Sequence, residues 1–174
     1  MIQLISITGT ESTGKTQLAR QLAAHYHTVF LPDYSRLYIE QLNRDYNQND
    51  VLEIANIIIE EENKMLQQAN KIFFSDNCLV NIKIWLQYFG WEVPEWLSEE
   101  IFNHKGSLHL LCDIDLEWVA DEQRKNPHDR NELFEQFKFE LDSAGAGYKI
   151  ISGKKNMRIE NAVDAVDKFL SSLK

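Results

Sequence analysis

Five short apolar runs are spaced along the chain, and longer amphipathic segments separate them. The runs cover residues 1–8, 29–31, 72–76, 108–113 and 148–151, and each is typical of a buried parallel strand. In the other segments, apolar residues recur at helical spacing, which predicts helices over residues 14–25, 50–69, 79–89, 94–102, 133–144 and 159–170. This alternation predicts an α/β fold, a three-layer sandwich with a five-stranded parallel sheet in the middle.

The longest predicted helix covers residues 50–69. Asp50 and Glu53 resemble a capping pair at its start. The acidic run 60–62 is predicted to face solvent, because consecutive charges on a helix usually mark its solvated face. This helix is therefore expected to serve packing rather than chemistry.

Composition indicates a single globular domain over residues 1–174. The chain has 174 residues, of which 44% are apolar and 26% are charged, as in an ordinary soluble protein. A net charge of −9 argues against a nucleic-acid partner, and no stretch is long and apolar enough for a membrane span. Cys78 and Cys112 are isolated in the sequence, which suits buried thiols in a reducing compartment. We therefore expect a cytoplasmic protein, and the sequence carries no signal for an oligomeric state.

A glycine-rich loop follows the first predicted strand. Residues 9–16 read G-x-x-x-x-G-K-T, the pattern of a loop whose backbone N–H groups surround a polyphosphate. Lys15 is expected to reach the β- and γ-phosphates of ATP, and the Thr16 hydroxyl to ligate the Mg²⁺ that bridges them. The predicted ATP-binding residues are Gly9, Thr10, Glu11, Ser12, Thr13, Gly14, Lys15, Thr16 and Gln17.

Two acids follow predicted strands and are candidates for a role beside this loop. Asp76 ends the third strand, and Asp113 ends the fourth. A P-loop protein needs such an acid to hold Mg²⁺ or to accept a proton from the attacking hydroxyl. The element order up to Asp76 is that of small kinases whose third strand lies beside the first, which favours Asp76. The sequence leaves Asp113 as the alternative.

Two further segments are candidates for ligand contacts. Residues 33–38 follow the second strand directly, and ligands bind at the carboxyl ends of strands in open parallel sheets. Residues 119–131 are strongly charged, contain Arg124 and Arg130, and lie between a strand and a helix. A mobile lid with arginines is a recurring way to neutralise a transferring phosphoryl group, so we predict a lid here.

These features favour a small-molecule kinase over other nucleotide-binding classes. A GTPase needs an N-K-x-D motif, and the nearest match at residues 63–66 lacks the aspartate and lies inside a predicted helix. A large ATPase motor needs a longer chain and, usually, an arginine from a neighbouring subunit. A single domain with a lid-like arginine segment fits neither class.

The chain also resembles the nicotinamide riboside kinase domain of NadR-type bacterial proteins over almost its whole length. The resemblance rests on the loop at residues 9–16 and on residues 33–38, 74–76, 83–85, 88–90, 111–113, 118–121 with Arg124, and 130–134. The segment Trp-Val-Ala-Asp at 118–121, with its spaced arginines, is more specific than the loop. The resemblance implies a P-loop kinase that uses ATP and Mg²⁺ to phosphorylate the 5′-hydroxyl of nicotinamide riboside.

Together, the resemblance and the residues suggest a role for each candidate side chain. Lys15, Asp76, Arg124 and Arg130 are the expected catalytic residues, and Thr16 and Asp76 the expected Mg²⁺ ligands. A pyridinium cation suits aromatic faces and carboxylates. The expected acceptor-binding residues are Asp33, Tyr34, Arg36, Trp85 and Trp118.

The chain departs from the family pattern at two positions near the expected acceptor. Asp33 stands where the family usually has glutamate, and Asn77 follows Asp76 where the family usually has threonine. A kinase for another nucleoside or small metabolite, and an ATP-binding regulatory module without acceptor turnover, therefore remain alternatives.

Overall fold

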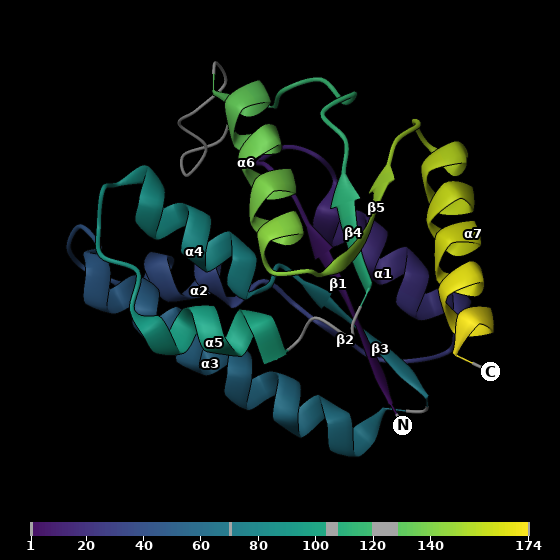
Figure 1. The fold of residues 1–174 in the computed structure, drawn as a ribbon, viewed down its shortest axis with the longest axis horizontal. Helices are drawn as coiled ribbons and strands as arrows, with labels where there is room; N and C mark the ends of the chain where they lie inside the picture. Colours follow the sequence, from purple (N-terminus) through teal and green to yellow (C-terminus); the bar gives the residue numbers. More distant parts are fainter. Residues whose placement is uncertain (1, 70, 104–107, 120–128, 174) are drawn as a thin grey trace.

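Five parallel strands form the centre of the protein in the computed structural model, which describes residues 2–69, 71–103, 108–119 and 129–173 (Figure 1). They lie in the order β2-β3-β1-β4-β5. β3 and β4 flank β1, with Ile5 paired to Phe74 on one side and to Leu108 on the other. The expected position of the third strand beside the first is confirmed. The strands are β1 (Gln3–Thr8), β2 (Phe30–Leu31), β3 (Ile72–Asp76), β4 (Leu108–Cys112) and β5 (Gly147–Ile151).

Helices cover both faces of the sheet, which confirms the predicted three-layer sandwich (Figure 1). One face packs against α1 (Lys15–His25) and α7 (Asn156–Ser172). The opposite face packs against α3 (Gln48–Gln68), α4 (Leu79–Tyr88), α5 (Glu95–Asn103) and α6 (Arg130–Ser143), and α2 (Tyr34–Gln41) packs beside α3. Among the described residues, none of the helices is long and apolar enough to cross a membrane.

The start of α3 differs from the sequence prediction. The helix begins at Gln48, and Asn47 is its cap, with an Oδ1 atom that accepts hydrogen bonds from the backbone N–H groups of Asn49 (2.9 Å) and Asp50 (3.4 Å). Asp50 closes the capping box by accepting from the Asn47 N–H at 2.8 Å. Hydrogen bonds from Arg44, and then the one from Asn47, lower the pKa of Asp50 to about 2. The sequence had predicted Asp50 and Glu53 as the capping pair. That prediction was wrong, because the capping pair is Asn47 and Asp50, one turn earlier.

Replacing Asn47 with alanine should lower the free energy of unfolding by about 1 kcal/mol, because two N–H groups of the first helical turn lose their acceptor. For a chain of this size, that loss corresponds to a decrease in Tm of about 2–4 °C. Asn56→Ala, at an exposed position in the middle of α3, is the matched control and should not lower Tm. Equal Tm values for Asn47→Ala and the wild type would contradict the capping assignment.

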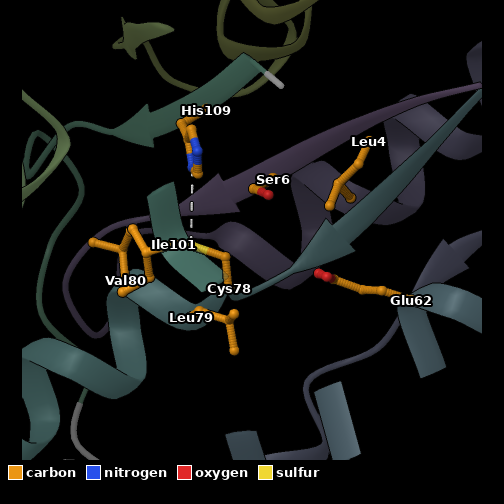
Figure 2. A pocket seen from close by; sticks show the side chains of 8 residues that line it. All are labelled: Leu4, Ser6, Glu62, Cys78, Leu79, Val80, Ile101 and His109. Carbon is orange, nitrogen blue, oxygen red and sulfur yellow. Dashed lines mark hydrogen bonds between the residues drawn. The ribbon is translucent and has the colours of Figure 1, made fainter. Parts of the chain in front are cut away.

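Glu62 is buried, although the acidic run 60–62 was predicted to face solvent. Its exposed fraction is only 4%, because it lies one turn beyond Ile58 on the face of α3 that packs against the sheet. Figure 2 shows Glu62 pointing toward the strands, at a small cavity of about 10 Å³. That volume is about the size of one water molecule.

The same cavity is lined by a cysteine and a histidine that have no sign of nucleophilic chemistry. Cys78 Sγ lies 3.9 Å from His109 Nδ1 (Figure 2). Burial raises the pKa of the Cys78 thiol to about 11, so the thiol remains protonated at neutral pH. The cluster is thus a polar part of the core.

Candidate active site

Two glycines shape the loop between β1 and α1. Gly9 has φ of +132°, and a Cβ atom at this position would lie 3.0 Å from the backbone oxygen of Cys112 in β4. Gly14 has φ of +78° and immediately precedes α1, whose first turn has no side-chain cap. The free N–H groups of that turn, together with the loop, form a site suited to an anion.

Polar side chains close the loop on itself. The hydroxyl of Thr13 donates to the backbone oxygen of Thr10 at 2.8 Å, and Lys15 Nζ donates to the same oxygen at 2.9 Å. Thr10 and Thr13 are both buried, at 3% and 1% exposure. Lys15 therefore lies across the loop, with its ammonium group on the Thr10 oxygen.

Asp76 lies at the end of β3, directly beside this loop. Its side chain is buried, and neither carboxylate oxygen has a hydrogen-bond partner among the described residues. Burial raises the pKa of Asp76, the nearby Thr16 hydroxyl and the Lys15 and Arg20 cations lower it, and the Asp33 carboxylate raises it. A buried acid with two free oxygens is costly to maintain, and its position points to a ligand.

Asp113 is placed differently, although it also follows a strand that pairs with β1. One of its carboxylate oxygens accepts a hydrogen bond from the Ile114 N–H at 2.8 Å. Its backbone N–H donates to Ile151 in β5 at 3.0 Å, and its backbone oxygen accepts from Arg158. Asp113 therefore already stabilises the turn after β4 through its own hydrogen bonds.

The residues after β2 form the start of α2. Asp33 is the helix cap, and one of its oxygens accepts from the Ser35 N–H at 2.9 Å and from the Ser35 hydroxyl. Asp33 also lies close enough to Asp76 to affect its pKa. Arg36 is exposed, and Tyr34 lies within electrostatic reach of Lys64 on α3. The Asp33 carboxylate thus lies near Asp76, which is beside the loop.

An aromatic cluster lies at the end of α4. Tyr46, in the segment before α3, packs edge-to-face with Trp85 at 5.2 Å and with Phe89 at 5.9 Å between ring centroids. Phe89 stacks on Trp91 at 4.8 Å. The hydroxyl of Tyr88, also in this region, donates to Asp129 at 3.0 Å.

The Glu11 carboxylate, in the loop between β1 and α1, interacts electrostatically with two tyrosines of this region, Tyr46 and Tyr88. Burial is the main cause of the raised pKa of Tyr46, and the Glu11 carboxylate raises it further. For Tyr88, the hydrogen bond to Asp129 is the main cause, and Glu11 again contributes. The sequence pattern did not single out Tyr46, because it lies in a short polar segment without periodicity. Glu11 was predicted only as part of the ATP loop.

Arg130 and the segment after β4 lie over the loop. Arg130 Nη1 donates to the backbone oxygen of Leu116 at 3.1 Å, and Nη2 donates to that of Ser12 at 3.5 Å. The Val119 N–H donates to the Ser12 hydroxyl at 2.9 Å. The guanidinium carbon of Arg130 lies 5.8 Å from the ring centroid of Trp118. Trp118 is thus placed beside Arg130 and the loop.

The predicted lid is described only at its two ends. Arg124 lies outside the described residues, as do residues 120–128 as a whole. Within the described part, Nε of Arg130 is buried and has no hydrogen-bond partner. This donor lies at the same end of the sheet as Asp76, because Arg130 contacts Ser12 of the loop.

An open pocket of about 350 Å³ adjoins the loop on the α1 side. Gln17 and Leu18 of α1 line it together with Leu116 from the segment after β4 and with Lys154 and Lys155 from the turn before α7. It is large enough for a planar heterocycle such as a purine base, and it opens next to Gly14.

Comparisons with known proteins agree with this architecture. A family model described as an AAA domain matches residues 4–158. No curated protein sequence matches the chain. Among solved structures, a NadR protein in complex with NR has a TM-score of 0.78 and 21% identity, over 97% of this chain and 51% of that chain. A NadR protein in complex with NAD and AMP-PNP has a TM-score of 0.74 and 19% identity, over 97% and 49%.

A nucleoside kinase is also similar. Deoxyadenosine kinase from M. mycoides, with products dCMP and a flexible dCDP bound, has a TM-score of 0.65 and 9% identity, over 95% of this chain and 100% of that chain. The chain spans about half the length of the NadR chains. The expected likeness to NadR is confirmed at the level of the fold, as is the nucleoside-kinase-like fold class.

Proposed function

The chain belongs to the AAA domain family, and from the site beside its phosphate loop we propose that it is an ATP-dependent kinase that phosphorylates the 5′-hydroxyl of nicotinamide riboside. The observation that carries the proposal is Asp76, a buried acid with two unpartnered oxygens beside Lys15 and Thr16 of the phosphate loop. A structural acid would have its oxygens satisfied within the protein. An acid that handles a substrate hydroxyl must keep them available.

The triphosphate of ATP would occupy the loop between β1 and α1. Backbone N–H groups of the loop and of the first turn of α1 would bind the phosphate oxygens, and Lys15 would turn from Thr10 toward them. The base would enter the pocket beside Gln17 and Leu116. In this arrangement the γ-phosphate lies at the carboxyl end of β1, next to Asp76.

The residues present also fit a magnesium ion. Mg²⁺ prefers hydroxyl and carboxylate oxygens, and the Thr16 hydroxyl and the unpartnered Asp76 carboxylate are near one another. When bound, the ion neutralises charge on the β- and γ-phosphates. Thr16 and Asp76 are therefore the residues that would hold it.

Asp76 would also act on the acceptor. In the proposed reaction, the acceptor 5′-oxygen attacks the γ-phosphorus, the bond from that phosphorus to the β,γ-bridging oxygen breaks, and ADP leaves. A carboxylate oxygen of Asp76 takes the hydroxyl proton. Arg130, with an unpartnered Nε, would bind charge on the phosphates, and Arg124 is proposed for the same role.

The neighbouring side chains suit a cationic aromatic acceptor. The cluster around Trp85 and Tyr46 provides aromatic rings, and Glu11 provides a negative charge close to it. Asp33, near Asp76, would bind hydroxyl groups of a ribose. Tyr34, Arg36 and Trp118 remain proposed acceptor contacts.

The two departures from the NadR pattern bear on the choice of acceptor. Asn77 has φ of +79°, a conformation that asparagine adopts more easily than the threonine usual in the family. Its Oδ1 is buried without a hydrogen-bond partner in the described residues, so a substrate donor would satisfy it. This observation supports a different nucleoside as the alternative acceptor.

The proposal is tested by ADP release from Mg²⁺-ATP, with nicotinamide riboside and with a panel of ordinary nucleosides. We expect stimulation by nicotinamide riboside alone, with the mononucleotide as the product. Stimulation by another nucleoside would overturn the acceptor assignment but keep the kinase. Bound ATP without stimulation by any acceptor would identify a nucleotide-binding regulatory module instead.

A further inference from the structure

Arg158 in the first turns of α7 is buried, with an exposed fraction of 5%. All three of its guanidinium nitrogens donate hydrogen bonds. Nε donates to the Gly153 oxygen at 2.9 Å, Nη1 to the Ile151 oxygen at 3.0 Å, and Nη2 to the Asp113 oxygen at 3.4 Å. Nη2 also forms an ion pair with Asp115. One side chain therefore joins β5, the turn after it and the segment after β4.

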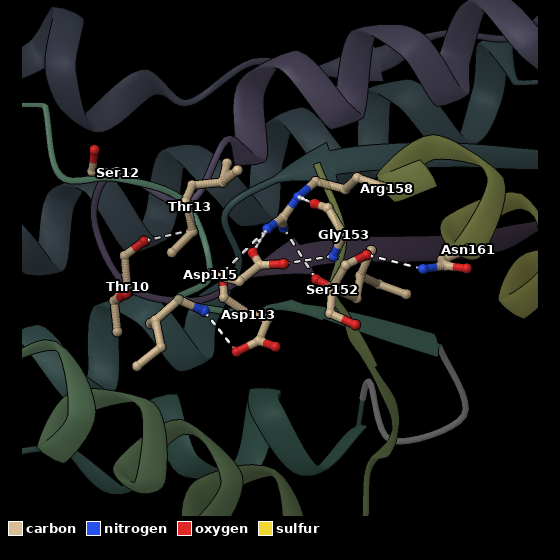
Figure 3. A network of polar contacts seen from close by, with 12 residues as sticks. Thr10, Ser12, Thr13, Asp113, Asp115, Ser152, Gly153, Arg158 and Asn161 are labelled. Carbon is tan, nitrogen blue, oxygen red and sulfur yellow. Dashed lines mark hydrogen bonds and ion pairs between the residues drawn. The ribbon is translucent and has the colours of Figure 1, made fainter. Parts of the chain in front are cut away.

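Asp115 completes the connection from the other side. While one of its oxygens pairs with Arg158, the other accepts a hydrogen bond from the Gly153 N–H at 2.6 Å. Figure 3 shows the carboxylate lying between the guanidinium group and the backbone of Gly153. The Gly153 backbone is thus held at both its N–H and its C=O by this pair.

The turn held in this way has a backbone that is costly to form. Gly153 has φ of +102°, and a Cβ atom there would lie 3.0 Å from Met157 Cγ and 3.3 Å from the Arg158 nitrogen. Lys155 has φ of +52° without being a glycine. Such conformations persist when surrounding contacts determine them, and they are concentrated at functional sites.

The residues next to this ion pair form two walls of one pocket. Leu116 and Glu117 follow Asp115, Lys154 and Lys155 follow Gly153, and all four line the pocket of about 350 Å³ beside the phosphate loop. The ion pair lies where the two walls meet.

We propose that Asp115 and Arg158 are positioning residues that hold the pocket open at the width of a nucleotide base. This inference rests on the proposed function, since it assumes that the pocket takes the base of the bound ATP. Arg158 also lines the pocket, but neither residue offers a free polar atom to the base, because both carboxylate oxygens of Asp115 and all three guanidinium nitrogens of Arg158 are engaged within the protein. They act through Leu116 and Lys155.

Binding of the base and binding of the phosphates depend on different contacts of the protein. The phosphate loop has its own contacts, from Thr13 and Lys15 to Thr10, and these do not involve Asp115 or Arg158. Loosening the two walls should therefore weaken the binding of ATP while leaving the binding of inorganic tripolyphosphate nearly unchanged. A defect of the whole fold would weaken both.

The test is calorimetric titration of the wild type, Asp115→Asn and Arg158→Lys with Mg²⁺-ATP and with Mg²⁺-tripolyphosphate. We expect Asp115→Asn to raise the Kd for ATP about tenfold, and that for tripolyphosphate less than about twofold. Arg158→Lys should act in the same direction, because an ammonium group cannot reach four acceptors in different directions. Should Arg158→Lys not fold, as judged by circular dichroism, Asp115→Asn decides alone.

Asp164→Asn is the matched control, since it removes an exposed ion pair with Lys168 on the same helix. It should change neither Kd. Equal weakening of ATP and tripolyphosphate, or an unchanged Kd for ATP in Asp115→Asn, would overturn the inference. Wild-type protein that binds ATP no more tightly than tripolyphosphate would also overturn it. The kinase proposal is tested separately, by acceptor-stimulated ADP release.

Discussion

Replacing Lys15 with alanine is expected to lower kcat for acceptor-dependent ADP release by about 10²–10³-fold, close to background. Lys15 is the loop's own cation, and its Nζ donates a hydrogen bond to the Thr10 oxygen at 2.9 Å. A cation that turns from Thr10 onto the phosphates and meets the charge that develops in the transition state typically contributes that factor to the rate. Steady-state ADP release with saturating acceptor measures it.

The fold should survive this substitution. The Thr10 oxygen keeps its hydrogen bond from the Thr13 hydroxyl, so the loop retains a contact that closes it. Lys149→Ala, which removes an exposed lysine from β5, is the control and should leave kcat unchanged. If Lys15→Ala turned over at the wild-type rate, the loop could not be the phosphate site.

Replacing Asp76 with asparagine should lower kcat by about 10²–10⁴-fold, the usual contribution of a general base, and should at the same time make the protein more stable. The wild type keeps a buried carboxylate without a hydrogen-bond partner in the described residues. Removing an unsatisfied buried charge of this kind gains about 1–3 kcal/mol. Thermal unfolding should show Tm higher by a few degrees.

The pH dependence follows from the direction of the Asp76 pKa. Burial raises this pKa above its ordinary value of 3.8, so the folded protein binds a proton at Asp76 more readily than the unfolded chain does. Between 3.8 and the raised pKa, stability therefore falls as pH rises, and the carboxylate form that the proposed reaction needs predominates only above the raised value. The wild type should lose activity on acidification at a pH above the ordinary aspartate range.

Asp113→Asn is the natural comparison for Asp76→Asn, because the two acids end the strands on either side of β1. Asp113 already accepts a hydrogen bond from the Ile114 N–H, so its replacement should leave kcat within about tenfold of the wild type. A larger loss in Asp113→Asn than in Asp76→Asn would reverse their proposed roles. A pure KM effect in Asp76→Asn would make Asp76 a binding residue.

Local patterns along the chain predicted most of the fold. Buried parallel strands are continuous apolar runs, so the strands ending at Asp76 and Cys112 were evident from sequence. The phosphate loop was equally evident, because its glycines and lysine lie within eight consecutive positions. The position of β3 beside β1 followed from these positions together with the small-kinase topology.

Features that depend on distant contacts could not be predicted in this way. Glu62 looked solvent-exposed because it stands in an acidic run, whereas the helical face it occupies is decided by packing against the sheet. Tyr46 meets Trp85 only because α3 and α4 pack together. Arg158 and Asp115 are 43 positions apart, and nothing in either local sequence marks them as partners.

The order β2-β3-β1-β4-β5 also has a consequence for biosynthesis. β1 is translated first, yet its second neighbour β4 is translated about 100 residues later, with Ile5 paired to Leu108. At 5–20 residues per second, one edge of β1 stays unpaired on the ribosome for roughly 5–20 s. The Gly9 turn also packs against Cys112, so the phosphate loop can reach its final shape only after β4 has left the ribosome. During that interval the nascent chain exposes an apolar strand edge, the kind of surface that chaperones protect from aggregation.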